Sequence, residues 1–245
     1  MVEIFFKVCY DKNIPKHGPL PGRNDTDYRR FPMKKHILCF GDSNTYGYCA
    51  VPSDCADGGY RFNEDERWPR LLQRHLGEEY LVIEEGLPGR TTVFSDPLHE
   101  CMSGLDAIYS CMMSQEPIDL LIIMLGTNDT KERLGANASC IGIGMERLVM
   151  KAKSIPGWGG KKPNILIVAP PHIGENLSDP PMGRGCPEKS RELAPYYKAV
   201  AERQECAFLD AEGIAEFNHH DWMHLTRKGH ADLAAHLAGV VRELV

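Results

Sequence analysis

From Met33 onward, short apolar runs alternate with longer stretches in which apolar and charged positions follow a helical period. The apolar runs predict five strands: His36–Phe40, Leu81–Glu85, Leu120–Leu125, Ile165–Ala169 and Ala207–Asp210. The amphipathic stretches predict five helices: Trp68–Leu76, Gly104–Met113, Ile143–Ala152, Ser190–Arg203 and Lys228–Val245. Such alternation is typical of a parallel sheet whose crossover helices cover both faces, so it predicts an α/β protein.

Two segments lack this alternation. Residues 1–32 contain several prolines and scattered charges without a period, so we interpret them as an N-terminal extension before a domain of residues 33–245. An upstream start codon, an added leader and a segment that packs on a neighbouring subunit all fit the extension. The Pro- and Gly-rich stretch from Pro170 to Pro187 predicts a long irregular loop at the carboxyl end of a strand, the edge where open α/β sheets bind ligands.

Composition narrows the classes of function. The net charge of -6, with acidic and basic residues mixed along the chain, argues against a nucleic-acid partner. No apolar run reaches the roughly 18 residues that cross a bilayer, and the first residues lack the pattern of a signal peptide. Nine cysteines without a C-x-x-C pair indicate free, mostly buried thiols. We therefore expect a cytoplasmic protein that binds neither nucleic acid nor membrane.

The first candidate for chemistry is Ser43, in the run FGDSNTYG that follows the first predicted strand. A strand that ends in glycine and turns sharply presents the next hydroxyl at the carboxyl edge of the sheet, where a nucleophile belongs. A Ser or Asp that caps the next helix explains the same run. The G-x-S-x-G elbow of another hydrolase class is absent, because Thr45 stands at its last position.

The second candidate is the D-x-x-H pattern of Asp221 and His224, shortly before the last predicted helix. A three-residue step on a tight turn holds a carboxylate and an imidazole on one side, so the segment can supply a base and the acid that orients it. An acid and a surface histidine beside a helix start explain the pattern equally simply. A metal site is a further alternative, built from His219, His220, Asp221 and His224.

Two further candidates follow the intervening strands. Asn128, in the run LGTND, has a neutral amide that can donate to an oxyanion without burying a charge, although an Asx turn also explains it. Gly89, in the run EGLPGRTT, has no side chain to block its backbone N–H, although a plain turn fits as well. Because these runs follow successive predicted strands, chance is a poor explanation of their order.

Together, G-D-S, the lone glycine, G-x-N-D and D-x-x-H resemble the motifs of the SGNH (GDSL) hydrolase family over nearly the whole domain. The resemblance implies a flavodoxin-like three-layer α/β/α sandwich with a central five-stranded parallel sheet. It implies Ser43 as nucleophile and His224 as base, oriented by Asp221. The implied oxyanion donors are the N–H groups of Ser43 and Gly89 and the side chain of Asn128.

Within that family, the strings ILCFGDSNTYGY, VIEEGLPGRTTV and DLLIIMLGTNDTK are similar to the bacterial arylesterase/acyltransferase branch. This similarity implies a homo-oligomeric esterase that acts on short-chain, acetyl-type esters through an acyl-enzyme, transfers acyl groups to alcohols and needs no cofactor or metal. A carbohydrate (xylan or sugar) acetyl esterase is the alternative, and a metal-dependent hydrolase on the histidine cluster is a remote one. The candidates for the substrate pocket are Asp42, Trp68, Arg90 and Trp222, although packing for Trp68 and an ion pair for Arg90 are the simpler interpretations.

Overall fold

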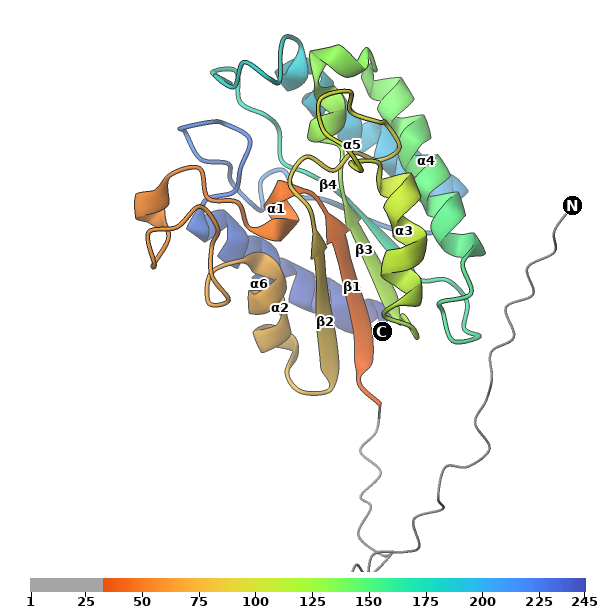
Figure 1. Cartoon of the computed structure of the whole chain (residues 1–245). Helices are drawn as coiled ribbons and strands as arrows, with labels where there is room; N and C mark the ends of the chain where they lie inside the picture. The colour runs from red at the N-terminus through yellow and green to blue at the C-terminus, as the bar shows by residue number, and fades with distance from the viewer. Residues whose placement is uncertain (1–32) are drawn as a thin grey trace, which may run out of the picture. The chain divides into compact units, whose positions relative to one another are not determined.

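The computed structural model describes residues 33–245 and contains, in that part, one sheet of five parallel strands (Figure 1). The predicted extension, residues 1–32, lies outside the described residues. The strands are β1 (Lys35–Gly41), β2 (Tyr80–Gly86), β3 (Leu120–Met124), β4 (Ile165–Ala169) and β5 (Ala207–Asp210). Their order in the sheet is β2-β1-β3-β4-β5, so the connections after β1 and β3 leave in opposite directions and open a crevice at their carboxyl ends.

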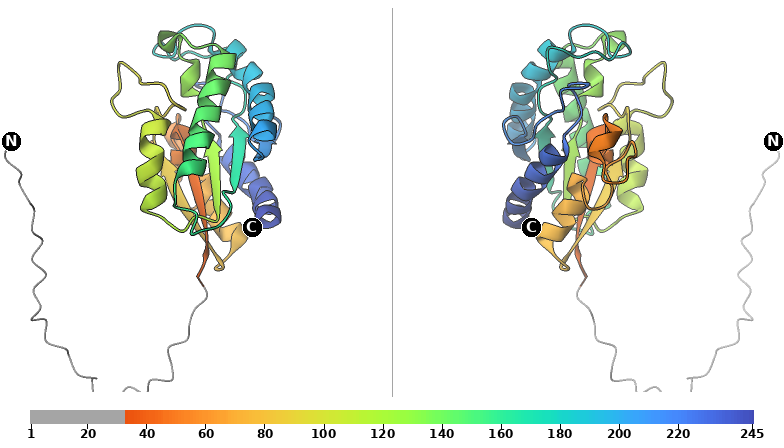
Figure 2. Two further views of the ribbon diagram at one scale, coloured as in Figure 1. Left: turned by 90° about the vertical axis from the view of Figure 1, so that its right-hand side faces the viewer. Right: turned by 90° about the vertical axis from the view of Figure 1, so that its left-hand side faces the viewer.

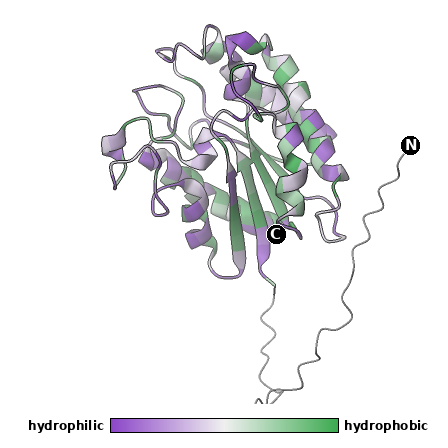
Figure 3. Ribbon diagram, viewed as in Figure 1, coloured by the Kyte–Doolittle hydropathy of each residue, from purple (hydrophilic) through white to green (hydrophobic). Residues whose placement is uncertain are grey.

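Helices cover both faces of the sheet, as Figures 1 and 2 show. The helices α2 (Trp68–Leu76) and α6 (Arg227–Leu244) pack on one face, and the opposite face carries α3 (Gly104–Met113), α4 (Ala138–Ser154) and α5 (Cys186–Arg203). Figure 3 shows why: the strands are hydrophobic, and the helices turn hydrophilic residues outward. The predicted three-layer α/β/α sandwich is confirmed.

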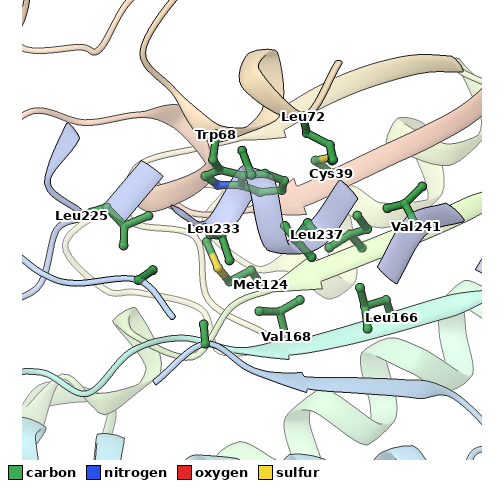
Figure 4. Close-up of a cluster of buried hydrophobic side chains, with 14 of the residues drawn as sticks. Cys39, Trp68, Leu72, Met124, Leu166, Val168, Leu225, Leu233, Leu237 and Val241 are labelled. Atoms are coloured by element: carbon green, nitrogen blue, oxygen red, sulfur yellow. The ribbon is translucent and has the colours of Figure 1, made fainter. Parts of the chain in front are cut away.

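Alternation along β1 divides the core between the two faces. Ile37 and Cys39 point toward α2 and α6, whereas Leu38 and Phe40 point toward the opposite helices. On the first face Trp68 is only 1% exposed and lies among core side chains of the sheet and α6 (Figure 4). Trp68 is therefore part of the core, which is the simpler of its two sequence interpretations.

The predicted helices differ from the observed ones mainly at their first residues. The predicted helix Ile143–Ala152 begins earlier, at Ala138, because the side chain of Asn137 accepts a backbone N–H of the first turn. Helix α5 begins at Cys186, within the predicted loop, and Pro187 occupies its first turn, where the missing N–H does no harm. In the part of the chain that the structure describes, three short 3₁₀ helices lie in connections: Pro52–Asp54, Asn128–Thr130 and Glu132–Leu134. No helix in residues 33–245 is long and apolar enough to cross a membrane.

The short helix α1 (Ser43–Tyr46), which the hydrophobic pattern does not predict, follows β1 directly. Asp42 caps it, because its carboxylate accepts the backbone N–H of Asn44 at 2.9 Å. Gly86 at the end of β2 lets α1 approach closely, since a Cβ there would meet the Tyr46 nitrogen at 2.2 Å. The buried Asp42 thus serves the helix as its cap, one of the interpretations that the run FGDSNTYG left open.

Candidate active site

Ser43 stands at the start of α1, at the carboxyl end of β1, and only 6% of the residue is exposed. Its Oγ lies 2.8 Å from Nε2 of His224, which is a hydrogen-bond distance. The two residues come from opposite ends of the domain. The fold therefore brings together the hydroxyl and the imidazole that the two sequence motifs single out.

The other ring nitrogen of His224, Nδ1, lies 2.7 Å from Oδ2 of Asp221. Oδ1 of Asp221 accepts the backbone N–H groups of Met223 and His224 and the side-chain amide of Asn218, at 2.9–3.2 Å. Burial raises the pKa of Asp221, but the hydrogen bond and charge of His224 outweigh it and hold this pKa below its ordinary value. An ionised Asp221 keeps the proton on Nδ1, so that Nε2 can accept the Ser43 proton.

The side chain of Asn44 holds the D-x-x-H turn against α1. Its amide donates to the carbonyl of Met223 at 3.1 Å, and its oxygen accepts the backbone N–H of Leu225 at 2.9 Å. These two bonds straddle His224 in the chain, and Asn44 is itself 1% exposed. Asn44, the residue after the candidate nucleophile, thereby joins α1 to the residues on either side of the candidate base.

Tyr48 packs against the imidazole of His224, with ring centroids 4.5 Å apart and planes inclined by 50°. A backbone hydrogen bond from Tyr48 N to Ser43 O at 2.9 Å holds it close to α1. Tyr48 is the last residue of the string ILCFGDSNTYGY but is not among the predicted site residues. Its signal is weak, since an aromatic residue after a short turn has no chemistry of its own to reveal a neighbour 176 positions away.

The two candidate oxyanion donors lie on the connections after β2 and β3. Gly89 has a φ of 90°, a left-handed conformation that strains any other residue. The side-chain amide of Asn128 donates one hydrogen to the carbonyl of Arg90 at 3.2 Å, which leaves the second hydrogen of that nitrogen for another acceptor. Gly89 and Asn128 line the same cavity as Ser43 and His224, so the fold collects all four motifs around one space.

This cavity has a volume of about 480 Å³, enough for a small ester. The loop between β4 and α5, the part of the chain predicted to be irregular, supplies Ser178, Asp179, Pro181 and Met182 to its wall. Other wall residues that sequence analysis missed are Ala50, His99, Lys131 and Arg133. Only Lys131 stands in one of the quoted strings, DLLIIMLGTNDTK, and no role is predicted for it there. The place of all four residues in the wall depends on how loops far apart in the chain fold together.

A buried carboxylate, Asp96, organises one side of the cavity. It pairs with Lys131 Nζ at 3.1 Å and with Arg133 Nη2 at 2.6 Å, and its side chain has no exposed surface. The hydrogen bond from Arg133 is the largest influence and, against the effect of burial, holds the pKa of Asp96 well below its ordinary value. Asp96 and His99 form a β-bridge in the connection after β2, so these ion pairs anchor the segment that carries His99 to the cavity.

None of the four residues expected in the substrate pocket lines this cavity. The guanidinium of Arg90 is buried, donates to the carbonyls of Gly41 and Glu85 and lies over the Phe40 ring at 4.2 Å, so it makes neither a pocket contact nor the expected ion pair. The indole of Trp222 faces a different surface hollow, beside the loop after β4, and the Asp42 and Trp68 side chains serve the helix cap and the core.

The histidine cluster of the metal alternative is not assembled. The rings of His219 and Trp222 stack, 4.4 Å apart and nearly parallel, and both nitrogens of His224 already face Ser43 and Asp221. Within residues 33–245, no group of three or more His, Cys, Asp or Glu side chains is arranged to hold a metal ion. The geometry therefore does not support a metal-dependent hydrolase built on these residues.

Comparisons with known proteins identify similar chains. The family described as GDSL-like lipase/acylhydrolase matches residues 39–231. The native aryl esterase of M. smegmatis is 37% identical, with a TM-score of 0.79, and the match covers 86% of this chain and 100% of that one. A carbohydrate acetylesterase from Sinorhizobium meliloti is 34% identical over the same shares, also with a TM-score of 0.79. A putative arylesterase from Agrobacterium tumefaciens str. C58 is 35% identical, with a TM-score of 0.76 and the same coverage.

Proposed function

Since the chain belongs to the GDSL-like lipase/acylhydrolase family, the SGNH hydrolases, and is a carboxylic ester hydrolase, we propose a specific reaction for it. It cleaves short-chain, acetyl-type esters, and Ser43 is the nucleophile. His224 is the general base and Asp221 orients it. Ser43 and Gly89 N–H groups and the Asn128 side chain bind the oxyanion. The observation that carries the proposal is the line of hydrogen bonds from Ser43 Oγ through His224 to Asp221.

In the first half of the reaction, Nε2 of His224 takes the proton of Ser43 while Oγ attacks the ester carbonyl. The carbonyl oxygen becomes an oxyanion and receives the three N–H donors, whose positions are set before the substrate arrives. When the tetrahedral intermediate collapses, the bond to the alcohol oxygen breaks and His224 gives its proton to the departing alcohol. The acyl group is then an ester of Ser43.

In the second half, water enters and His224 takes one of its protons as its oxygen attacks the acyl-enzyme. Collapse of the second intermediate returns that proton to Ser43 Oγ and releases the carboxylic acid. An alcohol in place of water releases a new ester by the same steps. We therefore include acyl transfer to alcohols in the proposal.

A carbohydrate acetyl ester is the second candidate substrate. The relative from Sinorhizobium meliloti is a carbohydrate acetylesterase. In this chain the cavity wall includes Ser178, Asp179 and Lys131, side chains that can exchange hydrogen bonds with the hydroxyl groups of a sugar. A series of p-nitrophenyl esters of rising chain length, run beside acetylated xylan and sugar acetates, distinguishes the two: a steep preference for acetate without sugar activity supports the simple ester.

We further propose that a domain of residues 33–245 assembles as a homo-oligomer in the cytoplasm. The similarity to the arylesterase branch supports the oligomer. The many thiols support a reducing compartment: all eight cysteines within residues 33–245 are free. Light scattering of the full chain and of residues 33–245 tests the assembly, and a monomer in both contradicts it.

The central experiment compares Ser43→Ala with Ser110→Ala, the same substitution on an exposed turn of α3. We expect Ser43→Ala to lose nearly all p-nitrophenyl acetate hydrolysis and all labelling by a fluorophosphonate, and Ser110→Ala to keep both. Full activity and labelling in Ser43→Ala would exclude Ser43 as the nucleophile. Loss of activity in EDTA, restored by zinc or manganese, would favour a metal-dependent reaction instead.

A further inference from the structure

Next to Asn128 in the chain lies a carboxylate that the proposed reaction does not use. Asp129 has no exposed surface, and its oxygens accept three hydrogen bonds from one residue, Thr92. The backbone N–H of Thr92 donates at 2.9 and 3.1 Å, and its hydroxyl donates at 2.5 Å. Within residues 33–245, no lysine, arginine or histidine forms an ion pair with Asp129.

Burying this carboxylate destabilises the folded protein. Burial raises the pKa of Asp129 to about 6, the hydrogen bonds from Thr92 oppose that rise, and the nearby carboxyl of Asp42 adds to it. A buried charge without a cation destabilises a folded protein unless its hydrogen bonds compensate. A buried titratable group at the edge of an active site therefore calls for a role beyond packing.

The position of Asp129 in the fold indicates that role. Gly89 is carried by the connection after β2 and Asn128 by the connection after β3, and in the sheet β1 separates these two strands. Strand pairing alone therefore does not place one connection against the other. Two sets of contacts join them: the Asn128 amide donates to the carbonyl of Arg90, and Asp129 holds Thr92, three residues beyond Gly89.

Thr92 has little freedom to move away from this carboxylate. It is fully buried, and on another side it touches α4 at Gly144, where a Cβ would come within 2.6 Å of its hydroxyl oxygen. The threonine is thus confined between Asp129 and the backbone of α4. Oδ1 of Asp129 receives both donors of Thr92, and Oδ2 receives the backbone N–H as well. A carboxylate suits this position because both of its oxygens only accept hydrogen bonds.

We propose that Asp129 is a positioning residue of the oxyanion site: by holding Thr92, its carboxylate sets the segment of Gly89 at the distance from Asn128 at which both N–H donors reach the same oxygen. Asp129 itself touches no substrate. The inference rests on the proposed function, since it explains how two of the proposed oxyanion donors are aligned. Misplacing one donor by about 1 Å is enough to weaken transition-state stabilisation strongly.

The experiment is a double-mutant cycle between Asp129→Asn and Asn128→Ala, with kcat and KM measured on p-nitrophenyl acetate. We expect Asp129→Asn to lower kcat by about 10- to 100-fold with KM within about twofold of the parent value, because the donors act in the transition state. In the Asn128→Ala background the same substitution should cost less than about threefold, since one of the two aligned donors is already gone. An equal loss in both backgrounds, no loss at all or a change in KM alone would each overturn the proposal.

The matched control is Asp119→Asn. Asp119 lies just before β3, at the opposite end of the same strand, and accepts the backbone N–H of His36 at 2.8 Å. This variant should keep the parent kcat. If Asp129→Asn does not fold, Thr92→Val and Thr92→Ser serve instead: removing the hydroxyl should lower kcat by about 3- to 10-fold, and keeping it should restore the parent value. Equal kcat in the two Thr92 variants contradicts the proposal.

The same variants distinguish a failure of the serine mechanism from a failure of the positioning role of Asp129. If Ser43→Ala and Asn128→Ala both keep full activity, the serine mechanism itself is wrong. If both lose activity while the effects of Asp129→Asn and Asn128→Ala simply multiply, the serine mechanism stands and the positioning role of Asp129 falls.

Discussion

The candidate site has two halves, one around Ser43 and His224 and one around Gly89 and Asn128. In each half a buried polar side chain binds a distant segment, but the two side chains differ in chemistry. On the triad side Asn44, the residue after Ser43, binds the turn that carries His224. On the oxyanion side Asp129, the residue after Asn128, binds the connection that carries Gly89. We call these contacts the Asn44 clamp and the Asp129 clamp. In each, a proposed catalytic residue is followed by a buried polar side chain that binds a distant segment.

The difference between the clamps follows from what each segment presents. The D-x-x-H turn presents one carbonyl and one N–H, from Met223 and Leu225, and a neutral amide satisfies both. Thr92 presents two donors, which an acceptor-only carboxylate satisfies. The Asn44 clamp therefore buries no charge, whereas the Asp129 clamp does. The donors and acceptors of each bound segment thus decide which residue holds it, even where that residue is a buried carboxylate.

Removing the Asn44 clamp is expected to have the largest effect on activity. Asn44→Ala leaves a buried carbonyl and a buried N–H without partners and frees the turn of His224, so kcat should fall by about 10²-fold and the free energy of unfolding by about 2–4 kcal/mol. Enzyme kinetics and urea unfolding measure the two effects. Asn164→Ala is the control. The Asn164 side chain likewise makes two hydrogen bonds to the backbone, here by donating to two carbonyls near the amino ends of the strands, so this variant should lose stability without losing kcat.

The triad side also buries a base, His230, whose nitrogen accepts the backbone N–H of Trp68. Burial, with the nearby charges of His224 and Arg67, lowers the pKa of His230 from 6.5 to about 3. In the unfolded chain His230 becomes protonated below about pH 6.5, whereas in the folded protein it stays neutral down to about pH 3. Between these pH values protonation favours the unfolded chain, so His230 makes the protein less stable as the pH falls.

The change is worth at most about 5 kcal/mol at 1.36 kcal/mol per pKa unit. His230→Gln should therefore flatten the pH dependence of unfolding between pH 3 and 6.5. Thermal unfolding across that range measures it. His236→Gln, at an exposed position of α6, should keep the parent profile. A profile equally steep in His230→Gln would show that the buried imidazole is not its source.

Asp129 is expected to change stability with pH in the direction opposite to His230. Because the pKa of Asp129 is raised from 3.8 to about 6, the folded protein holds a proton that the unfolded chain has lost between these values. This residue therefore makes the protein less stable as the pH rises from about 4 to 6. Relative to the parent, Asp129→Asn should gain up to about 3 kcal/mol of stability on going from pH 4 to pH 7, measured by urea unfolding. An unchanged difference between the two pH values would mean that the carboxyl is not perturbed.

The smallest effect is expected from Tyr48, whose ring packs on the imidazole of His224. The ring packs on the imidazole and limits its movement, so Tyr48→Leu should lower kcat/KM by about 3- to 10-fold, and Tyr48→Phe, which keeps the ring, should stay near the parent. Equal behaviour of the two variants would assign the effect to size rather than to the aromatic ring.

Much of the fold was predictable because its signals are local. The strands are apolar runs that two layers of helices must cover, and β4 and β5 have the predicted ends. The site was predictable in outline for a related reason: parallel strands end at one edge, so residues that follow them converge there. Ser43, Gly89 and Asn128 follow β1, β2 and β3 and line one cavity with His224. Their catalytic roles stay proposals until they are tested.

What the sequence by itself determined is the α/β architecture and the positions of the four motifs, because hydrophobic period and residue order act over a few neighbouring positions. Only the tertiary structure decided the direction and partner of each side chain. Trp68 points into the core and Trp222 away from the cavity. The partners of Asn44 lie 179 and 181 residues away in the chain, and the partner of Asp129 lies 37 residues away. Such contacts form when distant segments pack together, and no local pattern of residues encodes them.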